Sequence, residues 1–251
     1  MVYMGSKDRT AKYLIPIMNK IIKDNNIDYF FDMCVGGGNL SANKKHHLDV
    51  KNIIGVDNNK YLIALLKKLQ EKDFNFILVS KEEYYKIKPN KHNYEDWYVG
   101  YVGFLCSFAG KFFNGYNGID RNSKRNAPKE RYNNLINQRD SLLRVKLFHK
   151  DIFEIDYSKF PKNSLLYFDP PYSNTTKYHS EFDNVKFLEL VDTLSKDFIV
   201  LVSEFNAPND YISIWSKEKL STVNSEGKYK KDMEHLFIHK CNLKYINREE
   251  I

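Results

Sequence analysis

The fold is decided by the stretch YFFDMCVGGG, residues 29–38. A short apolar run ends at an acid, Asp32, and a triplet of glycines follows at residues 36–38. This order predicts a buried strand and then a loop, with a helix beginning at residues 40–42. A glycine loop lets a ligand approach the backbone closely, although a tight turn without a ligand accounts for the triplet equally well.

The segments on either side of this stretch extend the same strand–helix alternation. Apolar residues at helical spacing predict a helix over residues 10–25. Residues 53–57 predict a second short strand, which ends at Asp57, and a helix follows from Tyr61 to about Glu71. Strands that alternate with helices favour a parallel sheet, so we expect an α/β fold.

The alternation breaks between residues 80 and 144. No buried strand is predicted there; residues 94–109 are expected to be helical, 111–127 a loop rich in Gly and Asn, and 128–144 a charged helix. Strands then resume at residues 145–148, 165–168, 198–202 and 234–240, with a helix near 185–195. The sequence therefore predicts a sheet domain, residues 1–79 and 145–251, interrupted by a mostly helical insert, residues 80–144. Because long segments of this kind rarely lack a role, we expect the insert to have its own function.

The charge of the chain is concentrated in the predicted insert. The 251 residues include 39 Lys and Arg against 32 Asp and Glu, a net charge of +7. Between Lys86 and Lys146, 12 basic residues stand against 5 acidic ones, which leaves 27 of each sign elsewhere. This predicts a surface for a polyanion on the insert; the alternative is a solvated loop whose charges serve solubility.

Several classes of protein and site are excluded by composition. Hydrophobic residues at 42% and charged residues at 28% exclude wholesale disorder. No run of 18 apolar residues and no signal-peptide core is present, so we expect neither a membrane span nor secretion, and a cytoplasmic location. The three cysteines are far apart in sequence and the pair His46-His47 lacks further ligands nearby, so we expect no disulfide framework and no metal site.

The strongest chemical signal is LLYFDPPY, residues 165–172. It places Asp169 at the end of a predicted strand, as Asp32 and Asp57 end theirs, and ligands of open α/β sheets bind outside the carboxyl ends of the strands. The glycine loop and Asp57 together predict a nucleoside-containing cofactor, because an acid in that place accepts hydrogen bonds from ribose hydroxyls. The plainer alternative for residues 169–172 is a proline turn with a surface tyrosine.

These motifs resemble those of the Dam-like, phage-type family of adenine-specific DNA methyltransferases, which use S-adenosylmethionine. DPPY at residues 169–172 is similar to the catalytic motif, YMGSK at 3–7 to the N-terminal cofactor motif and FDMCVGGG at 31–38 to the glycine loop. SEFNAP at residues 203–208 and EHLF at 234–237 resemble later motifs. The pair Met33-Cys34 departs from the Pro-Phe or similar pair of many members. The resemblance spans nearly the whole chain and implies a Rossmann-like sheet with helices on both faces, and an insert that recognises the DNA target.

The resemblance also implies roles for single residues. The Asp169 carboxylate and the Pro170 carbonyl would accept hydrogen bonds from the 6-amino group of adenine, and Tyr172 would stack on the flipped-out base during direct, in-line methyl transfer. The implied cofactor-binding residues are Tyr3, Lys7, Asp32, Gly36, Gly38, Asp57, Asp151 and Asp169. Residues 151–153 could form the wall around the adenine of the cofactor. Alternatives stay open, because Lys7 could be a solvated lysine, Asp32 a cap for the next turn and Phe153 a core residue.

Double-stranded DNA is the implied partner, and the insert is where we expect it to bind. Basic and amide side chains suit phosphates and base edges, which selects Lys111, Asn114, Asn117, Arg121, Lys124, Arg125 and Arg131. We expect a monomer from a bacterium or bacteriophage and leave open a cognate restriction endonuclease as a partner. Two alternatives remain. One is methylation of the cytosine 4-amino group, although the Asp of DPPY and the motif order favour adenine. The other is a catalytically silent DNA-binding relative.

Overall fold

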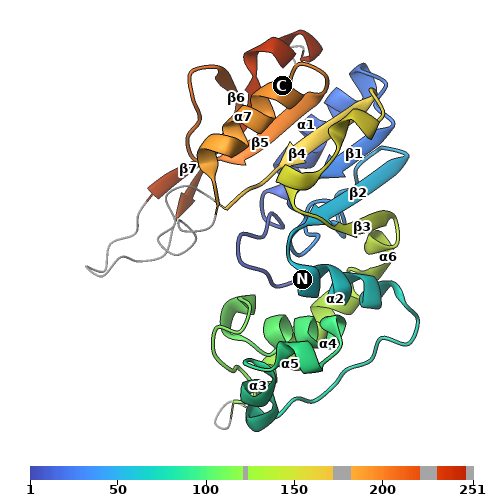
Figure 1. Cartoon of the computed structure of the whole chain (residues 1–251), viewed down its shortest axis with the longest axis vertical. Coiled ribbons are helices and arrows are strands. Elements are labelled where there is room, and N and C mark those ends of the chain that lie inside the picture. The colour runs from blue at the N-terminus through green and yellow to red at the C-terminus, as the bar shows by residue number, and fades with distance from the viewer. Residues whose placement is uncertain (121–123, 172–181, 221–230, 247–251) are drawn as a thin grey trace. The chain divides into compact units, whose positions relative to one another are not determined.

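The structure is a computed structural model that describes residues 1–120, 124–171, 182–220 and 231–246. Its chain divides into two units, and Figure 1 shows the elements of both. Unit 1 comprises residues 1–12, 35–47 and 53–152. Unit 2 comprises residues 13–34, 48–52 and 153–251.

Unit 2 contains a sheet of parallel strands that ends in an antiparallel hairpin. In spatial order its strands are β1 (Tyr29–Asp32), β4 (Ser164–Phe168), β5 (Ile199–Glu204), β7 (Lys231–His239) and β6 (Tyr211–Leu220). The first three run parallel, and β7 lies antiparallel to both β5 and β6. Every residue of β4 is buried, as expected of a central strand covered on both faces.

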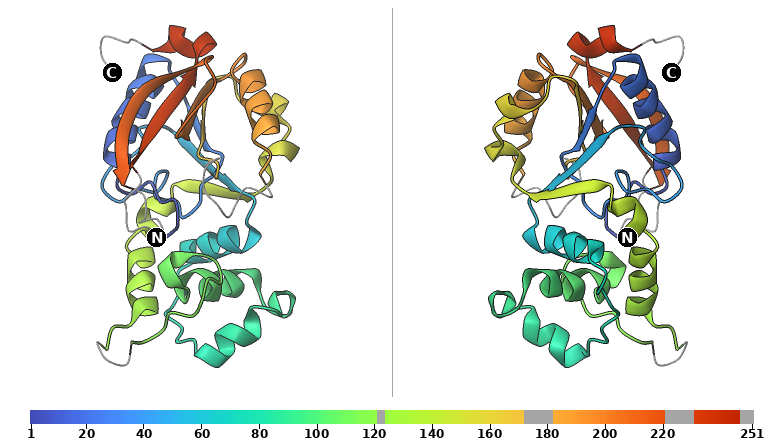
Figure 2. Two further views of the ribbon diagram at one scale, coloured as in Figure 1. Left: turned by 90° about the vertical axis from the view of Figure 1, so that its left-hand side faces the viewer. Right: turned by 90° about the vertical axis from the view of Figure 1, so that its right-hand side faces the viewer.

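Two helices cover this sheet, and Figure 2 shows them on opposite faces. They are α1 (Ala11–Asp24), which begins in unit 1 and lies mostly in unit 2, and α7 (Asn184–Leu194). Three short 3₁₀ helices complete the unit or border it: η4 (Ile152–Glu154), η5 (Tyr157–Lys159) and η6 (Lys240–Tyr245). The parallel strands and the helices on both faces confirm the α/β fold predicted from the sequence.

Unit 1 combines a parallel pair of strands with a group of helices. The strands are β2 (Asn52–Asp57, of which Asn52 falls in unit 2) and β3 (Val145–His149), and α2 (Lys60–Gln70) follows β2. The remaining helices are α3 (Lys81–Ile87), η1 (Lys91–Asn93), α4 (Asp96–Gly100), the π-helix η2 (Tyr101–Leu105), η3 (Phe108–Gly110), α5 (Ala127–Ile136) and α6 (Arg139–Leu142). A Cβ on Gly100 would lie 2.2 Å from the Tyr61 carbonyl oxygen. Helix α4 therefore packs closely on α2 because residue 100 has no side chain.

The predicted insert, residues 80–144, is mostly helical and falls in unit 1 together with α2, β2 and β3. Its separate function stays a prediction. No helix in the described residues is long and apolar enough to cross a membrane.

Three local predictions were wrong. No helix follows the glycine loop, because the Asn43 side-chain oxygen accepts the backbone amides of Lys45 and His46, both at 3.0 Å, and holds a turn instead. The helix expected over residues 128–144 breaks into α5 and α6 around Gln138. Strand β6 was not predicted, and a register shift between Ser213 and Trp215 interrupts its alternation.

Candidate cofactor and catalytic site

The glycine loop of unit 1 is fixed to the end of β2 by one carboxylate. Gly36 and Gly38 take positive φ angles of 50° and 68°, which glycine adopts without a steric penalty. The Gly36 amide donates to Asp57 Oδ2 at 3.0 Å, and the Asn59 amide donates to Asp57 Oδ1 at 2.9 Å. Asp57, the last residue of β2, therefore fixes the glycine loop that follows β1.

The surroundings of the Asp57 carboxylate allow it to accept a hydrogen bond from a ligand. Burial of the carboxylate raises its pKa, while the two backbone amides and the nearby His149 act in the opposite direction. The residue as a whole remains partly exposed. Each carboxylate oxygen accepts one backbone amide and has further lone-pair capacity, so Asp57 can accept a hydroxyl donor from a ligand.

The N-terminal segment lies directly on the glycine loop. A Cβ on Gly36 would come within 2.8 Å of Tyr3 Cε1, and a Cβ on Gly37 within 2.9 Å of Tyr3 Cβ. Lys7 is only 4% exposed, so the interpretation as a solvated lysine is wrong. Its carbonyl oxygen accepts the Ala11 amide at 2.8 Å, at the start of α1. The structure thus places Tyr3 directly on the glycine loop, and its role in binding a cofactor stays a prediction.

Two buried amide side chains that the sequence interpretation missed also hold this loop. Gln138 Nε2 donates to the carbonyl oxygens of Gly38 at 2.8 Å and Gly37 at 3.1 Å. Asn39 Nδ2 donates to Ser6 Oγ at 2.8 Å and so ties the N-terminal segment to the loop. One signal was available, because Gln138 lies at helical spacing between two leucines, at positions 135 and 142, on the apolar side of the predicted helix.

In unit 2, acidic side chains gather where β1 and β4 end. Asp32 pairs with Tyr167 in the parallel register, so Asp169 follows at the same end of the sheet. The Tyr167 hydroxyl is fully buried and lies 2.8 Å from Ser203 Oγ. Burial raises the pKa of Tyr167 well above its usual value, and the charges of Asp169, Asp32 and Glu234 raise it further. We call these three carboxylates, whose charges all act on the Tyr167 hydroxyl, the acid cluster.

The three carboxylates of the acid cluster differ in exposure. Asp32 is 2% exposed and Glu234 is 1% exposed, whereas Asp169 is partly exposed. Carboxylates in such an environment favour a cationic group or a strong hydrogen-bond donor as a ligand. Glu234 on β7 was not among the predicted site residues, although it lies in a segment that resembles a family motif. Pro170 is buried, and Tyr172 lies outside the described residues.

The two remaining positions of the predicted cofactor wall differ from each other. Asp151 is half-buried just after β3. Phe153 packs on Phe182 with ring centroids 5.9 Å apart, and the Lys186 ammonium lies 4.6 Å from the Phe153 ring centroid. These contacts favour the interpretation of Phe153 as a packing residue of unit 2.

The predicted DNA-binding residues fall into three groups. Asn114, Lys124 and Arg125 are exposed, although Arg125 is held by both Glu130 carboxylate oxygens at 2.7–3.0 Å. Lys111 and Asn117 are half-buried. Arg131 is also half-buried, and its Nη1 donates to the Leu105 carbonyl oxygen at 2.7 Å. Arg121 lies outside the described residues.

Comparison with known proteins gives a family over most of the chain. Residues 3–232 match the model of the D12 class N6 adenine-specific DNA methyltransferases. The type II methyltransferase M.FokI of Planomicrobium okeanokoites is 21% identical over 86% of this chain, which spans only 37% of that protein's length. M.MjaIII of Methanocaldococcus jannaschii, also a type II methyltransferase, is 25% identical over 71% of this chain and 70% of its own. A methylase of known crystal structure from Haemophilus influenzae covers 93% of this chain and 95% of its own, at 13% identity and a TM-score of 0.35.

The contact of Arg131 predicts a role in stability that Lys124 does not share. Arg131→Ala leaves the Leu105 carbonyl oxygen without its donor, so we expect the free energy of unfolding to fall by about 1–3 kcal/mol. The exposed control Lys124→Ala should change it by less than about 0.5 kcal/mol. Urea denaturation followed by fluorescence measures both; equal losses in the two variants would contradict the assignment.

Proposed function

Because the chain belongs to the D12 class of N6 adenine-specific DNA methyltransferases, we propose that it transfers a methyl group from S-adenosylmethionine to the 6-amino group of adenine in double-stranded DNA. The observation that carries this proposal is Asp169. It follows β4 in the order Asp-Pro-Pro-Tyr and belongs to the acid cluster, within the residues that match the family. An acceptor is thereby placed at the carboxyl end of a parallel strand, where ligands of such sheets bind.

The residues of the chain fit S-adenosylmethionine, which carries a sulfonium and an ammonium group besides its adenosine. Asp57 would accept the ribose hydroxyls, beside the glycine loop whose Gly36 amide it holds. Asp32 would bind the ammonium group, since the acid cluster favours cations. Tyr3, Lys7, Gly36, Gly38 and Asp151 complete the proposed set. When bound, the cofactor supplies an electrophilic methyl group.

Asp169 and Pro170 would act on the nucleophile. The lone pair of the adenine amino nitrogen is delocalised into the ring, which makes it a poor nucleophile. Two acceptors directed at the amino hydrogens would localise that lone pair, and the fixed φ angles of the prolines would hold the acceptors in place. The base must leave the duplex to reach them, and Tyr172 is the proposed stacking partner.

The DNA would bind to the insert through side chains that are exposed there. Lys124 and Asn114 are accessible as they stand, whereas Arg125 would exchange Glu130 for a phosphate. Lys111, Asn117, Arg121 and Arg131 stay predictions. A cognate restriction endonuclease, a monomeric state and a cytoplasmic location in a bacterium or bacteriophage are also proposals. We keep the cytosine 4-amino group as a second candidate target, because it would use the same acceptors.

Loss of the Asp169 charge should abolish turnover. In Asp169→Asn we expect methyl transfer to unmethylated plasmid DNA to slow by at least about 100-fold, since the amide keeps one acceptor oxygen but lacks the negative charge that would balance the positive charge developing on the amino nitrogen. Affinity for S-adenosylmethionine should change by less than about tenfold, or 1.4 kcal/mol. Nucleoside mass spectrometry of the DNA identifies the product, and the exposed Asp49→Asn is the control. Turnover near the wild-type rate would remove Asp169 from the reaction, and 4-methylcytosine as the product would favour the second candidate.

Affinity for S-adenosylmethionine should depend on pH through Asp57. The charged carboxylate accepts hydroxyl donors, so affinity is complete above the Asp57 pKa and is lost as the pH falls through it. Because burial raises this pKa, the loss should begin above the usual aspartate value of about 4. Asp57→Asn should bind about 10–100-fold more weakly with little pH dependence in this range. Titration calorimetry between pH 7.5 and pH 5 measures the affinity of both proteins for S-adenosylmethionine. An unaltered affinity in Asp57→Asn would refute the assignment of Asp57 to the ribose.

The salt dependence of DNA binding tests the insert. Lys124→Ala combined with Arg125→Ala removes two candidate phosphate contacts, which should reduce the slope of log affinity against log salt by up to about 1.8. Lys44→Ala combined with Lys45→Ala is the matched control, because both lysines are exposed in unit 1 outside the insert. Fluorescence anisotropy of a labelled duplex between about 50 and 200 mM salt gives the slopes. The same slope in both double variants would place the DNA elsewhere.

A further inference from the structure

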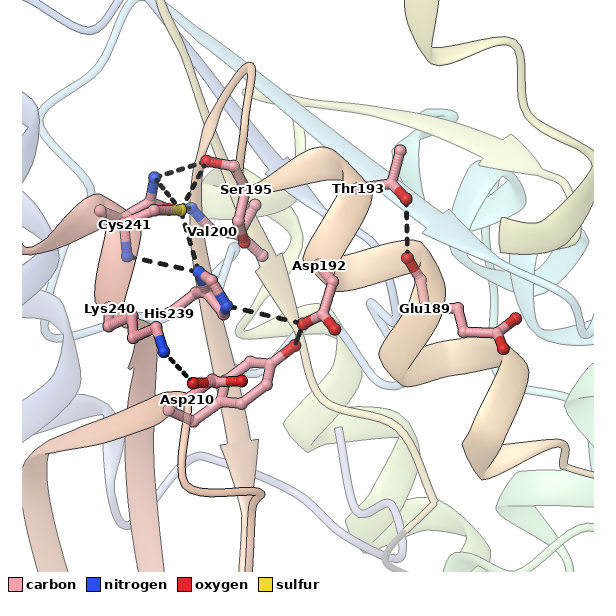
Figure 3. Close-up of polar contacts among 11 residues, drawn as sticks. Glu189, Asp192, Thr193, Ser195, Val200, Asp210, His239, Lys240 and Cys241 are labelled. Carbon is pink, nitrogen blue, oxygen red and sulfur yellow. Dashed lines mark hydrogen bonds and ion pairs between the residues drawn. The ribbon is translucent and has the colours of Figure 1, made fainter.

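A second group of reactive side chains lies in unit 2, where β7 ends and η6 begins, and Figure 3 draws it. Cys241 Sγ lies 2.9 Å from His239 Nδ1. The other ring nitrogen, Nε2, lies 3.8 Å from Oδ1 of Asp192 on α7. Cys241 is exposed to solvent. A thiol, an imidazole and a carboxylate thus follow one another in the order of a nucleophile, a base and the group that orients the base.

The tautomer of His239 follows from a backbone contact. The Cys241 amide N–H donates to His239 Nδ1 at 3.3 Å, so Nδ1 is an acceptor and the neutral ring carries its hydrogen on Nε2. Nε2 lies 3.8 Å from Asp192 Oδ1, within ion-pair range but longer than a hydrogen bond. The Nδ1 lone pair therefore faces the thiol as well as the amide, and Asp192 would stabilise the imidazolium that forms when the thiol proton moves to Nδ1.

Neighbouring groups hold this arrangement in place. The Tyr211 hydroxyl donates to Asp192 Oδ1 at 2.6 Å, and the Tyr211 ring packs edge-on against His239 with centroids 5.3 Å apart. Burial and then Asp192 raise the pKa of Tyr211, so this hydroxyl stays a donor. The remaining charged groups beside the ring, Asp210 and Lys240, form an ion pair with each other.

The sulfur atom has its own polar surroundings. Asn242, which is 1% exposed, has its Nδ2 at 3.7 Å from Cys241 Sγ and 2.7 Å from the Ser195 carbonyl oxygen. The same carbonyl oxygen lies 3.2 Å from the sulfur. The thiol proton therefore has two acceptors within reach, the Ser195 carbonyl and His239 Nδ1. When the proton is on His239, the Asn242 amide remains as a donor near the thiolate.

This geometry suits one kind of sulfur chemistry more than others. Acyl transfer needs hydrogen-bond donors for an oxyanion, whereas the backbone group that lies 3.2 Å from the sulfur is an acceptor, the Ser195 carbonyl oxygen. Metal binding is disfavoured, because Cys241 and Asp192 face opposite nitrogens of one imidazole and cannot share an ion with it. Thiol–disulfide exchange needs only a thiolate and access, since the negative charge passes to the leaving sulfur.

We propose that Cys241 is a site of covalent modification by low-molecular-weight disulfides, with His239 as the base. The Cys241 thiol gives its proton to His239 Nδ1, and the thiolate attacks one sulfur of the disulfide. A bond forms between the two sulfurs, the original disulfide bond breaks, and the departing thiolate takes the proton from His239. Cys241 is thereby oxidised to a mixed disulfide, and the other half of the reagent is reduced to a thiol.

The other two cysteines of the chain provide a comparison for the reactivity of Cys241. Burial raises the pKa of the Cys106 thiol to about 12, so that sulfur is both inaccessible and protonated. Cys34 is partly exposed. Selective modification at Cys241 would distinguish the base-assisted thiol from both.

The experiment exposes the full chain to oxidised glutathione and locates the adduct by mass spectrometry. We expect one adduct, on Cys241, which is absent from Cys241→Ser. His239→Asn keeps a side-chain oxygen to cap the Cys241 amide but has no base, so its rate at pH 7 should fall at least about tenfold and should rise more steeply with pH. Asp192→Asn should react about threefold to tenfold more slowly. The exposed His92→Asn is the control and should react at the wild-type rate.

Two results would overturn the proposal. The first is an adduct that forms on Cys34 in preference to Cys241. The second is an unchanged rate and pH profile in His239→Asn, whose folding is checked by circular dichroism. If His239→Asn does not fold, Asp192→Asn decides in its place, and an unchanged rate there equally overturns the proposal.

Discussion

The carboxylate of Asp57 holds the part of unit 1 on which the proposed cofactor site depends. It accepts the backbone amides of Gly36 and Asn59, one from the glycine loop and one from the turn that starts α2. The loop has no side chains of its own in that place, and the Tyr3 ring occupies the space that a Cβ would need. Its amide side is thus fixed by the acid of β2 and its carbonyl side by Gln138. A conformation with positive φ angles persists because both sets of backbone groups are engaged.

The fold was predictable where local pattern and burial agree. The apolar runs that became β1, β2, β4 and β5 are short, end in polar residues and alternate with helical periodicity, so their assignment needed no tertiary information. The failures have tertiary or side-chain causes. The segment after the glycine loop was expected to be a helix, but Asn43 captures the amides that a helix would use. Strand β6 carries charged residues and an irregular register, so its pattern resembles a loop.

The candidate site was predictable only in part, for a related reason. Acids that end strands have a sequence signature, which is why Asp32, Asp57 and Asp169 were identified together. Gln138 and Glu234 act on residues far away in the chain, and neither the helical spacing of Gln138 nor the motif-like segment around Glu234 indicates those partners. For the basic residues of the insert, the composition gave the net charge but did not show which groups each side chain contacts. Arg125 pairs with Glu130, and Arg131 supports the Leu105 carbonyl.

The hydrogen bonds of Gln138 limit the modularity of this chain. The glutamine belongs to the predicted insert, yet its amide supports two carbonyl oxygens of the glycine loop. A recombination event that exchanged residues 80–144 for the corresponding segment of a relative would remove the Gln138 hydrogen bonds to Gly37 and Gly38 unless the incoming segment carried an equivalent amide. The Gly38 carbonyl oxygen would still accept the Ala42 amide at 2.8 Å, so the loss would fall mainly on Gly37, at a cost of about 1–3 kcal/mol. If the insert recognises DNA as proposed, point changes among its exposed side chains would keep this support of the glycine loop, whereas exchange of the whole segment would remove it.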